Sequence, residues 1–193
     1  MVFNRIVDFI DSSDCALFRL GCIIVMRGKW TQECVTTKTC PGAVAGLRAQ
    51  ASIRLGSELE IALTGRNEGD RKLSYTAALH SYLAVSEAEG LHVEGLGEEI
   101  EMRGEVDREF GASRGPYRLE DPAFARKILV EKENSSTTVV WNPGPDKARA
   151  LSDVGEGSRH GMVCVEAVRA GANRVTLEPG EEETFATTIG LVG

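Results

Sequence analysis

The sequence predicts an all-β protein built as an antiparallel β-sandwich. Three observations support this fold: apolar residues recur at every second position from residue 51 onward, clusters of Gly, Pro, Asn and Asp separate these segments, and no segment sustains the 3.6-residue period of a helix. The chain has 193 residues, which is enough to bury one core. We therefore expect one sandwich domain over residues 49–193, preceded by a segment of different character at residues 1–48.

The clearest alternation lies between residues 53 and 85. In the first part, the odd positions hold the apolar residues Ile53, Leu55, Leu59, Ile61 and Leu63, which predicts one half-buried strand. Residues 67–70 then supply a turn, Asn-Glu-Gly-Asp. The alternation resumes after the turn through Leu73, Tyr75, Leu79, Leu83 and Val85. The two segments are predicted to pair as a hairpin.

The rest of the chain reads as short strands with turns between them. Further strands are expected at residues 90–94, 127–131, 137–141, 162–166, 174–177 and 184–191, and a short helical turn at residues 146–151. The first 48 residues mix apolar and polar side chains without a clean period and contain four of the five cysteines. Residues 22–26 are the one strand expected there.

Composition and charge exclude several classes of function. The net charge is −7, whereas nucleic-acid binding rests on clustered Lys and Arg, so no nucleic-acid partner is expected. The longest apolar stretch, residues 16–26, contains Arg19 and is shorter than the roughly 20 residues that cross a bilayer, which predicts no membrane partner. The N-terminus is acidic and unlike a secretory signal, so we expect a cytoplasmic protein with reduced thiols. No metal site is expected, because no CxxC pair or nearby histidine accompanies Cys15, Cys22, Cys34 and Cys40.

His80 is the first candidate for chemistry. If Leu79 and Leu83 point to the core, strand alternation turns Thr76, His80 and Tyr82 to the opposite face. This places a histidine on a polar face of a central strand. The ordinary alternative is a strand histidine whose ring is satisfied by a neighbouring carbonyl group.

Glu166 is the second candidate, because it follows the apolar run at residues 162–165. A carboxylate within such a run must be paired, hydrogen-bonded or open to a cleft, since isolated burial costs several kcal/mol. The ordinary alternative is that the strand ends there and Glu166 meets solvent. A histidine and a glutamate on facing strands could act as an acid and a base across a small substrate, each contributing on the order of 10²- to 10⁴-fold in rate.

Other polar residues have simpler explanations. Asp107 is followed by Arg108, which suggests an ordinary surface ion pair. His92 and His160 lie among polar residues and are expected to be exposed. Trp141 precedes a turn and could offer its ring to a sugar, although a core tryptophan that enters a turn is the more frequent case.

Several segments, taken in order, resemble the hexose-6-phosphate mutarotases, or glucose-6-phosphate 1-epimerases, of the aldose 1-epimerase family. The family's central strand with its catalytic histidine is similar to residues 75–85, YTAALHSYLAV. Its aspartate that contacts substrate lies in a segment similar to residues 105–108, EVDR. Its VVWNP segment is matched by residues 139–148, VVWNPGPDKA. Its catalytic-glutamate strand and its VTLxPGE ending are matched by residues 162–167, MVCVEA, and residues 175–181, VTLEPGE.

The resemblance covers residues 51–193, about three quarters of the chain, and carries expectations about fold and activity. It implies a galactose mutarotase-like supersandwich that is incomplete here, because residues 1–48 do not match the family's N-terminal part. It also implies interconversion of the α and β anomers of a hexose 6-phosphate. In that reaction His80 protonates the ring oxygen, Glu166 removes the proton of the C1 hydroxyl, and Asp107 contacts the substrate. No cofactor and no metal are implied, and we expect a monomer whose partner is a small hexose or hexose phosphate.

The resemblance leaves two alternatives open. A sandwich that lacks the family's N-terminal part can be catalytically silent and bind carbohydrate or a protein partner. It can also be a fragment whose strand edges stay open to association. The family's phosphate-binding arginines belong to the unmatched part, so we expect weak binding of a hexose phosphate. The cations available to replace them are Arg5, Arg19, Arg27, Lys29 and Arg48.

Overall fold

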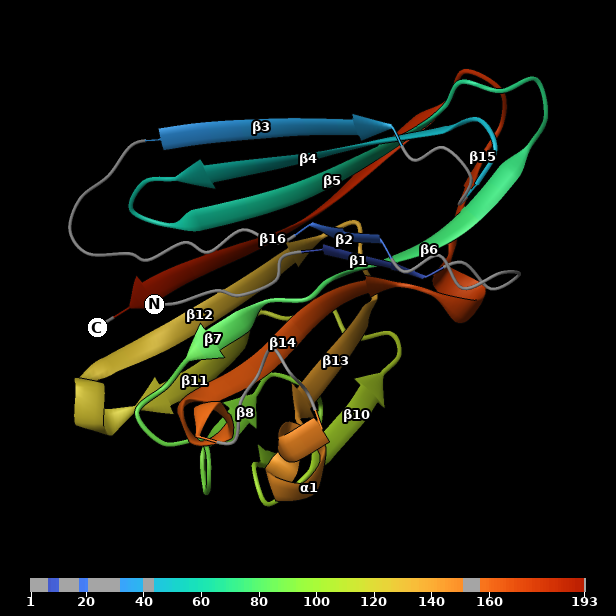
Figure 1. Cartoon of the computed structure of the whole chain (residues 1–193). Helices are drawn as coiled ribbons and strands as arrows, with labels where there is room; N and C mark the ends of the chain where they lie inside the picture. Colours follow the sequence, from blue (N-terminus) through green and yellow to red (C-terminus); the bar gives the residue numbers. More distant parts are fainter. Residues whose placement is uncertain (1–6, 11–17, 21–31, 40–43, 151–156, 193) are drawn as a thin grey trace.

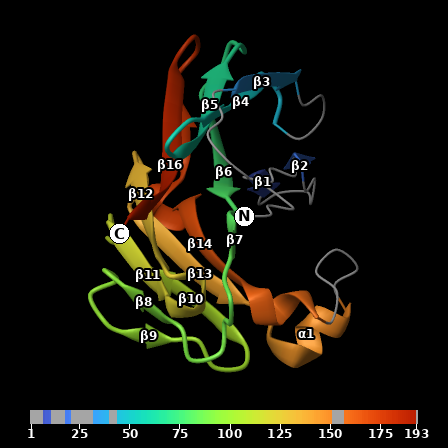
Figure 2. The ribbon, with the colours of Figure 1, turned by 90° about the vertical axis from the view of Figure 1, so that its left-hand side faces the viewer.

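The computed structural model describes residues 7–10, 18–20, 32–39, 44–150 and 157–192, and gives only the backbone for the first three of these ranges. Two antiparallel sheets of eight strands each form two layers (Figures 1 and 2). The predicted all-β sandwich is therefore confirmed. No helix among the described residues is long and apolar enough to cross a membrane.

The first sheet is the layer that carries the candidate site. Its strands run in the order β10 (Val106–Phe110), β13 (Thr137–Asn142), β14 (Met162–Arg169), β6 (Leu73–Leu79), β1 (Val7–Ile10) and β2 (Phe18–Leu20). Two short strands complete it: β7 (Tyr82–Ala84) pairs with β14, and β15 (Val175–Leu177) pairs with β6.

The second sheet forms the opposite layer. Its strands run in the order β3 (Gln32–Thr39), β4 (Leu47–Leu55), β5 (Leu59–Asn67), β16 (Glu182–Val192), β12 (Arg126–Glu133), β11 (Tyr117–Asp121), β8 (His92–Glu94) and β9 (Ile100–Glu101). The helical elements are short: α1 (Gly144–Ala150) and the 3₁₀ turns η1 (Pro122–Phe124), η2 (Ser158–Gly161) and η3 (Gly171–Asn173). Strands β1 and β3 bring the N-terminal region into both sheets, through backbone pairing with β6 and β4.

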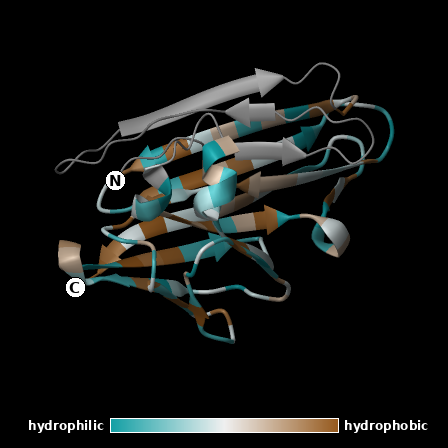
Figure 3. Cartoon of the chain, turned by 60° about the horizontal axis from the view of Figure 1, so that its bottom comes forward, coloured by the Kyte–Doolittle hydropathy of each residue, from teal (hydrophilic) through white to brown (hydrophobic). Residues whose placement is uncertain are grey.

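The core lies between the sheets and follows from alternation along their strands. In β5, residues 59, 61 and 63 are buried against the first sheet, and the residues between them are partly exposed. In β14, Val163, Val165 and Ala167 fill the other side of the same core. Figure 3 shows polar and apolar residues alternating along the strands. Burial of each large apolar side chain contributes about 1.5–3 kcal/mol, so this period of two specifies the inward face.

The strand predicted over residues 53–63 is two strands, which is a correction. A bend at residues 56–58 separates β4 from β5, and the two pair with Leu55 opposite Leu59. Because this loop has three residues, odd positions stay on the inward face in both strands. The alternation of apolar residues therefore continues across the loop, so the pattern alone does not reveal that the strand ends there.

The predicted hairpin of this segment with residues 73–85 is also wrong. β5 pairs with β4 and β16, whereas β6 lies in the other sheet. The chain crosses between the sheets after Asn67, whose amide donates to the carbonyl groups of Arg71 (2.8 Å) and Leu177 (3.1 Å). Alternation shows which side of a strand is buried, but both sheets face one core, so it cannot show which sheet the strand joins.

The six further predicted strands are present as β8, β12, β13, β14, β15 and β16, with ends that differ by a few residues. The expected helical turn is present as α1 and begins two residues earlier than predicted. Strands β1, β2, β3, β9, β10 and β11 were not predicted. β10 was missed because the charged Arg108 occupies its middle inward position, between the buried Val106 and Phe110. The strand expected at residues 22–26 lies outside the described residues.

Candidate active site

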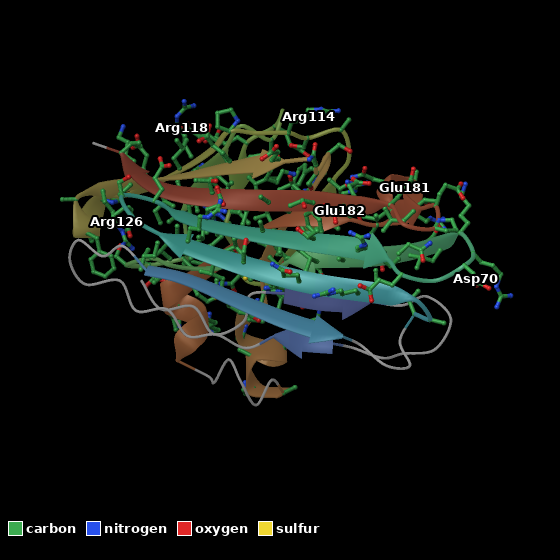
Figure 4. All side chains as sticks on the ribbon, turned by 90° about the horizontal axis from the view of Figure 1, so that it is seen from above. Asp70, Arg114, Arg118, Arg126, Glu181 and Glu182 are labelled. Atoms are coloured by element: carbon green, nitrogen blue, oxygen red, sulfur yellow. The ribbon has the colours of Figure 1, made fainter. Side chains whose placement is uncertain are left out.

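The outer faces of the two sheets differ in chemistry. The outer face of the second sheet carries ordinary cross-strand ion pairs, such as Arg54 with Glu60 (2.8 Å) and Lys127 with Glu120 (2.6 Å). Figure 4 views this face and shows Asp70, Glu181 and Glu182 toward one end and Arg126 at the other. The outer face of the first sheet carries instead a small cluster formed by Tyr82, Met162, Cys164 and the partly buried Trp141. This second cluster is where the predicted site residues lie.

A continuous register places His80 opposite Glu166. β6 ends at Leu79, opposite Ala167, and β7 begins at Tyr82, opposite Cys164. The register is the same on both sides of the two-residue gap, so β6 and β7 behave as one interrupted strand along β14. Opposite residues of antiparallel strands project to the same face, which puts the imidazole and the carboxylate side by side.

The two side chains are in direct contact. Nε2 of His80 lies 3.1 Å from a carboxylate oxygen of Glu166, and the two side chains are only 16% and 6% exposed. The two residues lie on one face of the first sheet at neighbouring positions along β14, not on facing strands as the sequence suggested. The expected arrangement with a small substrate between them is wrong, because the shared register leaves no space between opposite positions. The alternative that the strand ends at Glu166 is also wrong, since β14 continues to Arg169.

Aromatic rings surround this pair. The Tyr82 ring stacks on the His80 ring with centroids 4.7 Å apart, and the Trp141 ring meets His80 edge-on at 5.5 Å. Tyr82 and Trp141 are themselves perpendicular, at 6.2 Å. The more frequent case considered for Trp141, a place in the main core, does not apply, because its ring belongs to the outer cluster. The rings hold the imidazole orientation and keep much of its surface from water.

The turn after Trp141 fixes the end of β13. The Asn142 amide donates to the carbonyl groups of Arg159 and Met162, both at 2.8 Å, and its oxygen accepts the N–H of Gly144 at 2.9 Å. Gly144 has φ of +61°, and a Cβ there would lie 2.6 Å from the backbone nitrogen of Glu105. The Asn-Pro-Gly sequence therefore has a local structural reason that is separate from chemistry.

Cys164 is a member of the site that the sequence reasoning missed. It is fully buried, and its thiol is free. Burial, aided by the negative charge of Glu166, raises the pKa of this thiol. One donor atom from each of His80, Cys164 and Glu166 lies within 4.8 Å of the other two. The available signal was parity, since Cys164 precedes Glu166 by two residues and so shares its face.

Asp107 lies on the same face but apart from the acid/base pair. It is opposite Trp141, and β13 separates its strand from β14, a distance of two strand spacings or about 10 Å. Its carboxylate is 57% exposed and lies 3.6 Å from Nζ of Lys147, which also contacts Glu105 at 2.5 Å. The expected surface pair of Asp107 with Arg108 is wrong, because Arg108 points to the other face and pairs with Glu98 at 2.7 Å.

The remaining histidines lie away from this cluster, as expected. His92 and His160 are both exposed and lie near Glu99 (2.7 Å) and Glu87 (3.7 Å). Among the cations suggested for phosphate binding, Arg48 belongs to the second sheet and pairs with Glu68 at 3.1 Å. The side chains of the other four lie outside the described residues.

Comparison with known proteins identifies the family. Residues 95–190 match the aldose 1-epimerase family. A protein of Cenchrus ciliaris named "Putative glucose-6-phosphate 1-epimerase" is 33% identical over 152 residues, which cover 67% of this chain and 46% of that protein. The chain belongs to the aldose 1-epimerase family. A Salmonella typhimurium protein of the same name is 27% identical over 150 residues, covering 66% of this chain and 48% of the relative. This aldose 1-epimerase family member thus spans about half the length of the curated relatives it matches.

Solved structures agree on the fold. A crystal structure of a "putative mutarotase" from Salmonella typhimurium superposes with a TM-score of 0.66 at 23% identity, covering 76% of this chain and 54% of that one. The galactose 1-epimerase of Lactobacillus acidophilus superposes with a TM-score of 0.62 at 14% identity, covering 83% and 62%. The sandwich of this aldose 1-epimerase family member is therefore of the galactose mutarotase-like type.

Proposed function

We propose that this protein is a mutarotase-type isomerase that interconverts the α and β anomers of a hexose 6-phosphate. The observation that carries the proposal is the contact of His80 with Glu166, 3.1 Å apart within an aromatic cluster on the outer face of the first sheet. Membership in the aldose 1-epimerase family and the names of the two relatives support it.

Direct contact between the acid and the base suits this reaction. The ring oxygen and the C1 hydroxyl of a pyranose are bonded to the same carbon, so two groups that touch each other can reach both oxygens from one side. The sugar therefore binds over the pair and not between its members. Trp141, which is only partly buried, flanks the pair and offers apolar ring surface to the sugar, as aromatic side chains do in small-molecule sites.

The proton transfers balance in one cycle. His80 donates the proton of its ring nitrogen to the ring oxygen while Glu166 accepts the proton of the C1 hydroxyl, and the bond from C1 to the ring oxygen breaks as the aldehyde forms. After rotation about the C1–C2 bond, the ring closes on the other face of the carbonyl group. Glu166 then gives its proton to the carbonyl oxygen at C1, which becomes the new C1 hydroxyl, and His80 regains its own proton from the attacking hydroxyl. Acid and base catalysis of this kind contributes on the order of 10²- to 10⁴-fold per group.

Asp107 is proposed to bind substrate at the edge of the site. Its exposed carboxylate lies on the same face as the pair and can accept hydrogen bonds from sugar hydroxyl groups. Lys147, which approaches Asp107 and Glu105, is a cation on this side of the fold. A phosphate held by one lysine would be bound less tightly than one held by arginine forks.

The test is anomerisation of α-glucose 6-phosphate, followed by polarimetry or by NMR exchange spectroscopy, with α-glucose as the parallel substrate. Catalysed exchange of the phosphorylated sugar supports the proposal. Equal rates for both sugars would overturn the preference for a hexose phosphate, and no rate above the buffer blank for either would overturn the activity.

The alternative of a silent carbohydrate-binding sandwich is favoured by one observation, the coverage of only about half of each curated relative. The same NMR samples separate the two functions. A silent module would shift the resonances of the Trp141 indole as sugar is added, without any exchange between the anomers.

A further inference from the structure

The outer cluster brings together three different metal-binding groups. The imidazole of His80, the thiol of Cys164 and the carboxylate of Glu166 place one donor atom each within 4.8 Å of the other two. Cys164 and Glu166 lie on β14, and His80 lies in the two-residue gap between β6 and β7, whose shared register along β14 holds all three on one face. Cys164 and Glu166 are buried, and His80 is mostly so. Strand positions hold side chains more firmly than loops do, which favours a defined site.

We propose that His80, Cys164 and Glu166 bind a single divalent cation of intermediate softness, with Zn²⁺ as the best match, and that the bound ion blocks the acid/base pair. Zinc takes nitrogen, sulfur and carboxylate oxygen ligands, whereas Mg²⁺ and Ca²⁺ prefer oxygen alone. The inhibition by the bound ion rests on the proposed mutarotase function. The binding of the ion does not depend on that function.

The geometry requires only small movements. Ligand atoms around a tetrahedral zinc ion lie about 3.5 Å apart, given bonds of about 2.0–2.3 Å. Nε2 of His80 and the carboxylate of Glu166 are already 3.1 Å apart. The distances from the sulfur of Cys164 to these two groups are at most 4.8 Å, so a decrease of about 1 Å brings all three donor atoms to the spacing that zinc requires. Three protein ligands leave a fourth position for water, or for a sugar hydroxyl.

Binding of the metal ion changes the protonation of its ligands and blocks the two catalytic groups. The thiol of Cys164 loses its proton to solvent when its sulfur binds the ion, and the imidazole binds in its neutral form. A ring nitrogen of His80 and an oxygen of Glu166 are then both occupied by the metal. The histidine can no longer deliver a proton to the ring oxygen, and the glutamate is a weaker base.

Cobalt spectroscopy tests the site without any activity assay. The chain carries four further cysteines, so the experiment starts from a variant with Cys15, Cys22, Cys34 and Cys40 all changed to Ser. Titration of this metal-free variant with Co²⁺ should give a thiolate-to-cobalt charge-transfer band in the near ultraviolet. The band should saturate at one ion per chain, and Zn²⁺ should remove it. Absence of the band would overturn the proposal.

Substitutions within the same background identify the ligands. Cys164→Ser should abolish the charge-transfer band and weaken Co²⁺ binding about a hundredfold or more, as loss of a direct ligand exceeds the 10- to 100-fold effect of a supporting group. Cys164→Ala provides a second variant in case one of them fails to fold, and circular dichroism reports on folding. His92→Ala is the matched control, because His92 is an exposed histidine paired with Glu99. A folded Cys164 variant in this background has no cysteine left, so an unchanged band would show that the band does not come from a thiolate and would overturn the site.

The inhibition by the bound ion is measured separately. Each variant is assayed for anomerisation in EDTA and then in excess Zn²⁺, relative to its own rate in EDTA. Zinc should suppress the rate of the four-serine variant reversibly and suppress the Cys164 variants much less. Cobalt binding with an unaffected rate would overturn the inhibition. A chain that binds cobalt but shows no rate in EDTA would contradict the proposed function and leave the metal site standing.

Discussion

The carboxylate of Asp121 in β11 lies 2.9 Å from the guanidinium of Arg126 in β12. Both side chains form hydrogen bonds with the end of β7 and the residues just after it. Asp121 is fully buried and accepts hydrogen bonds from the backbone N–H (3.2 Å) and the hydroxyl group of Ser86. Arg126 donates to the carbonyl oxygen of Ala84. An ion pair of the second sheet thus anchors the strand of the first sheet that carries Tyr82.

Replacement of Asp121 by Ala should lower the free energy of unfolding by about 3–5 kcal/mol, because it leaves Arg126 largely buried without its partner. Urea denaturation followed by tryptophan fluorescence measures this. Glu120→Ala is the control: it removes only an exposed ion pair with Lys127, so the free energy of unfolding should change far less. Similar losses for both variants would contradict the anchoring role.

Glu166→Gln should reduce the anomerisation rate on the order of 100-fold or more, because an amide keeps the shape of the side chain but cannot accept the C1 proton. Circular dichroism should show an unchanged fold. Glu182→Gln, on the outer face of the second sheet, should leave the rate as it is. A folded Glu166→Gln variant with normal turnover would exclude this residue as the base.

Two buried tyrosines should respond in opposite ways to loss of the hydroxyl group. The Tyr75 hydroxyl is buried with no hydrogen-bond partner in the described part of the chain, and Tyr75→Phe should stabilise the protein by about 1 kcal/mol. The Tyr117 hydroxyl bonds to Thr138 (2.6 Å) and Ser113 (3.0 Å), so Tyr117→Phe should destabilise it by about 1–2 kcal/mol. Chemical denaturation of both variants provides the comparison, and a loss of stability in Tyr75→Phe would show that its hydroxyl is satisfied.

Lys132 should make stability depend on pH. Its ammonium group reaches the carbonyl oxygens of Ser113 (3.0 Å) and Thr137 (2.8 Å), and burial, aided by the charge of Arg114, lowers its pKa to about 7. The unfolded chain keeps this proton up to the ordinary pKa of 10.5, so between about 7 and 10.5 the unfolded state binds more protons than the folded state. The free energy of unfolding from this group therefore rises with pH across that window.

The measurement is the urea midpoint of the parent chain and of Lys132→Met from pH 6 to pH 10. The urea midpoint of the parent chain minus that of Lys132→Met should increase as the pH rises above 7. Lys127→Met serves as the control, because the hydrogen bond to Glu120 raises the pKa of the exposed Lys127, the opposite direction to that of Lys132. A flat difference curve for Lys132→Met would mean that the folded chain holds this proton as firmly as the unfolded one.

The sequence indicates which face of the sheet the site residues occupy, but not which side chains touch one another. Alternation around Leu79 and the apolar run before Glu166 were enough to put His80 and Glu166 on one face. Their direct contact depends on the register between β6 and β14, which is set by distant strands and loops and is invisible to a local pattern. For the same reason Cys164, two residues from Glu166, was passed over as an ordinary member of a buried run.

The wrong pairings have a similar origin. Charge suggested Arg108 as the partner of Asp107, its neighbour in sequence, but neighbours on a strand point to opposite faces. The true partner, Lys147, comes from α1, some forty residues away in the chain. The predicted hairpin of β5 with β6 failed because a crossing between layers leaves the same alternation as a tight turn.

β14 divides its residues between two tasks. Val163, Val165 and Ala167 face the core, whereas Cys164 and Glu166 face the outer cluster. Substitutions at one set change the interior without altering the reactive groups, and substitutions at the other change reactivity without opening a void between the layers. A family built on such a strand can exchange its chemistry at even positions while selection for folding acts on the odd ones. Deleting a single residue from the middle of this strand would instead turn the residues on one side of the deletion to the opposite face, which moves reactive positions into the core and core positions out of it.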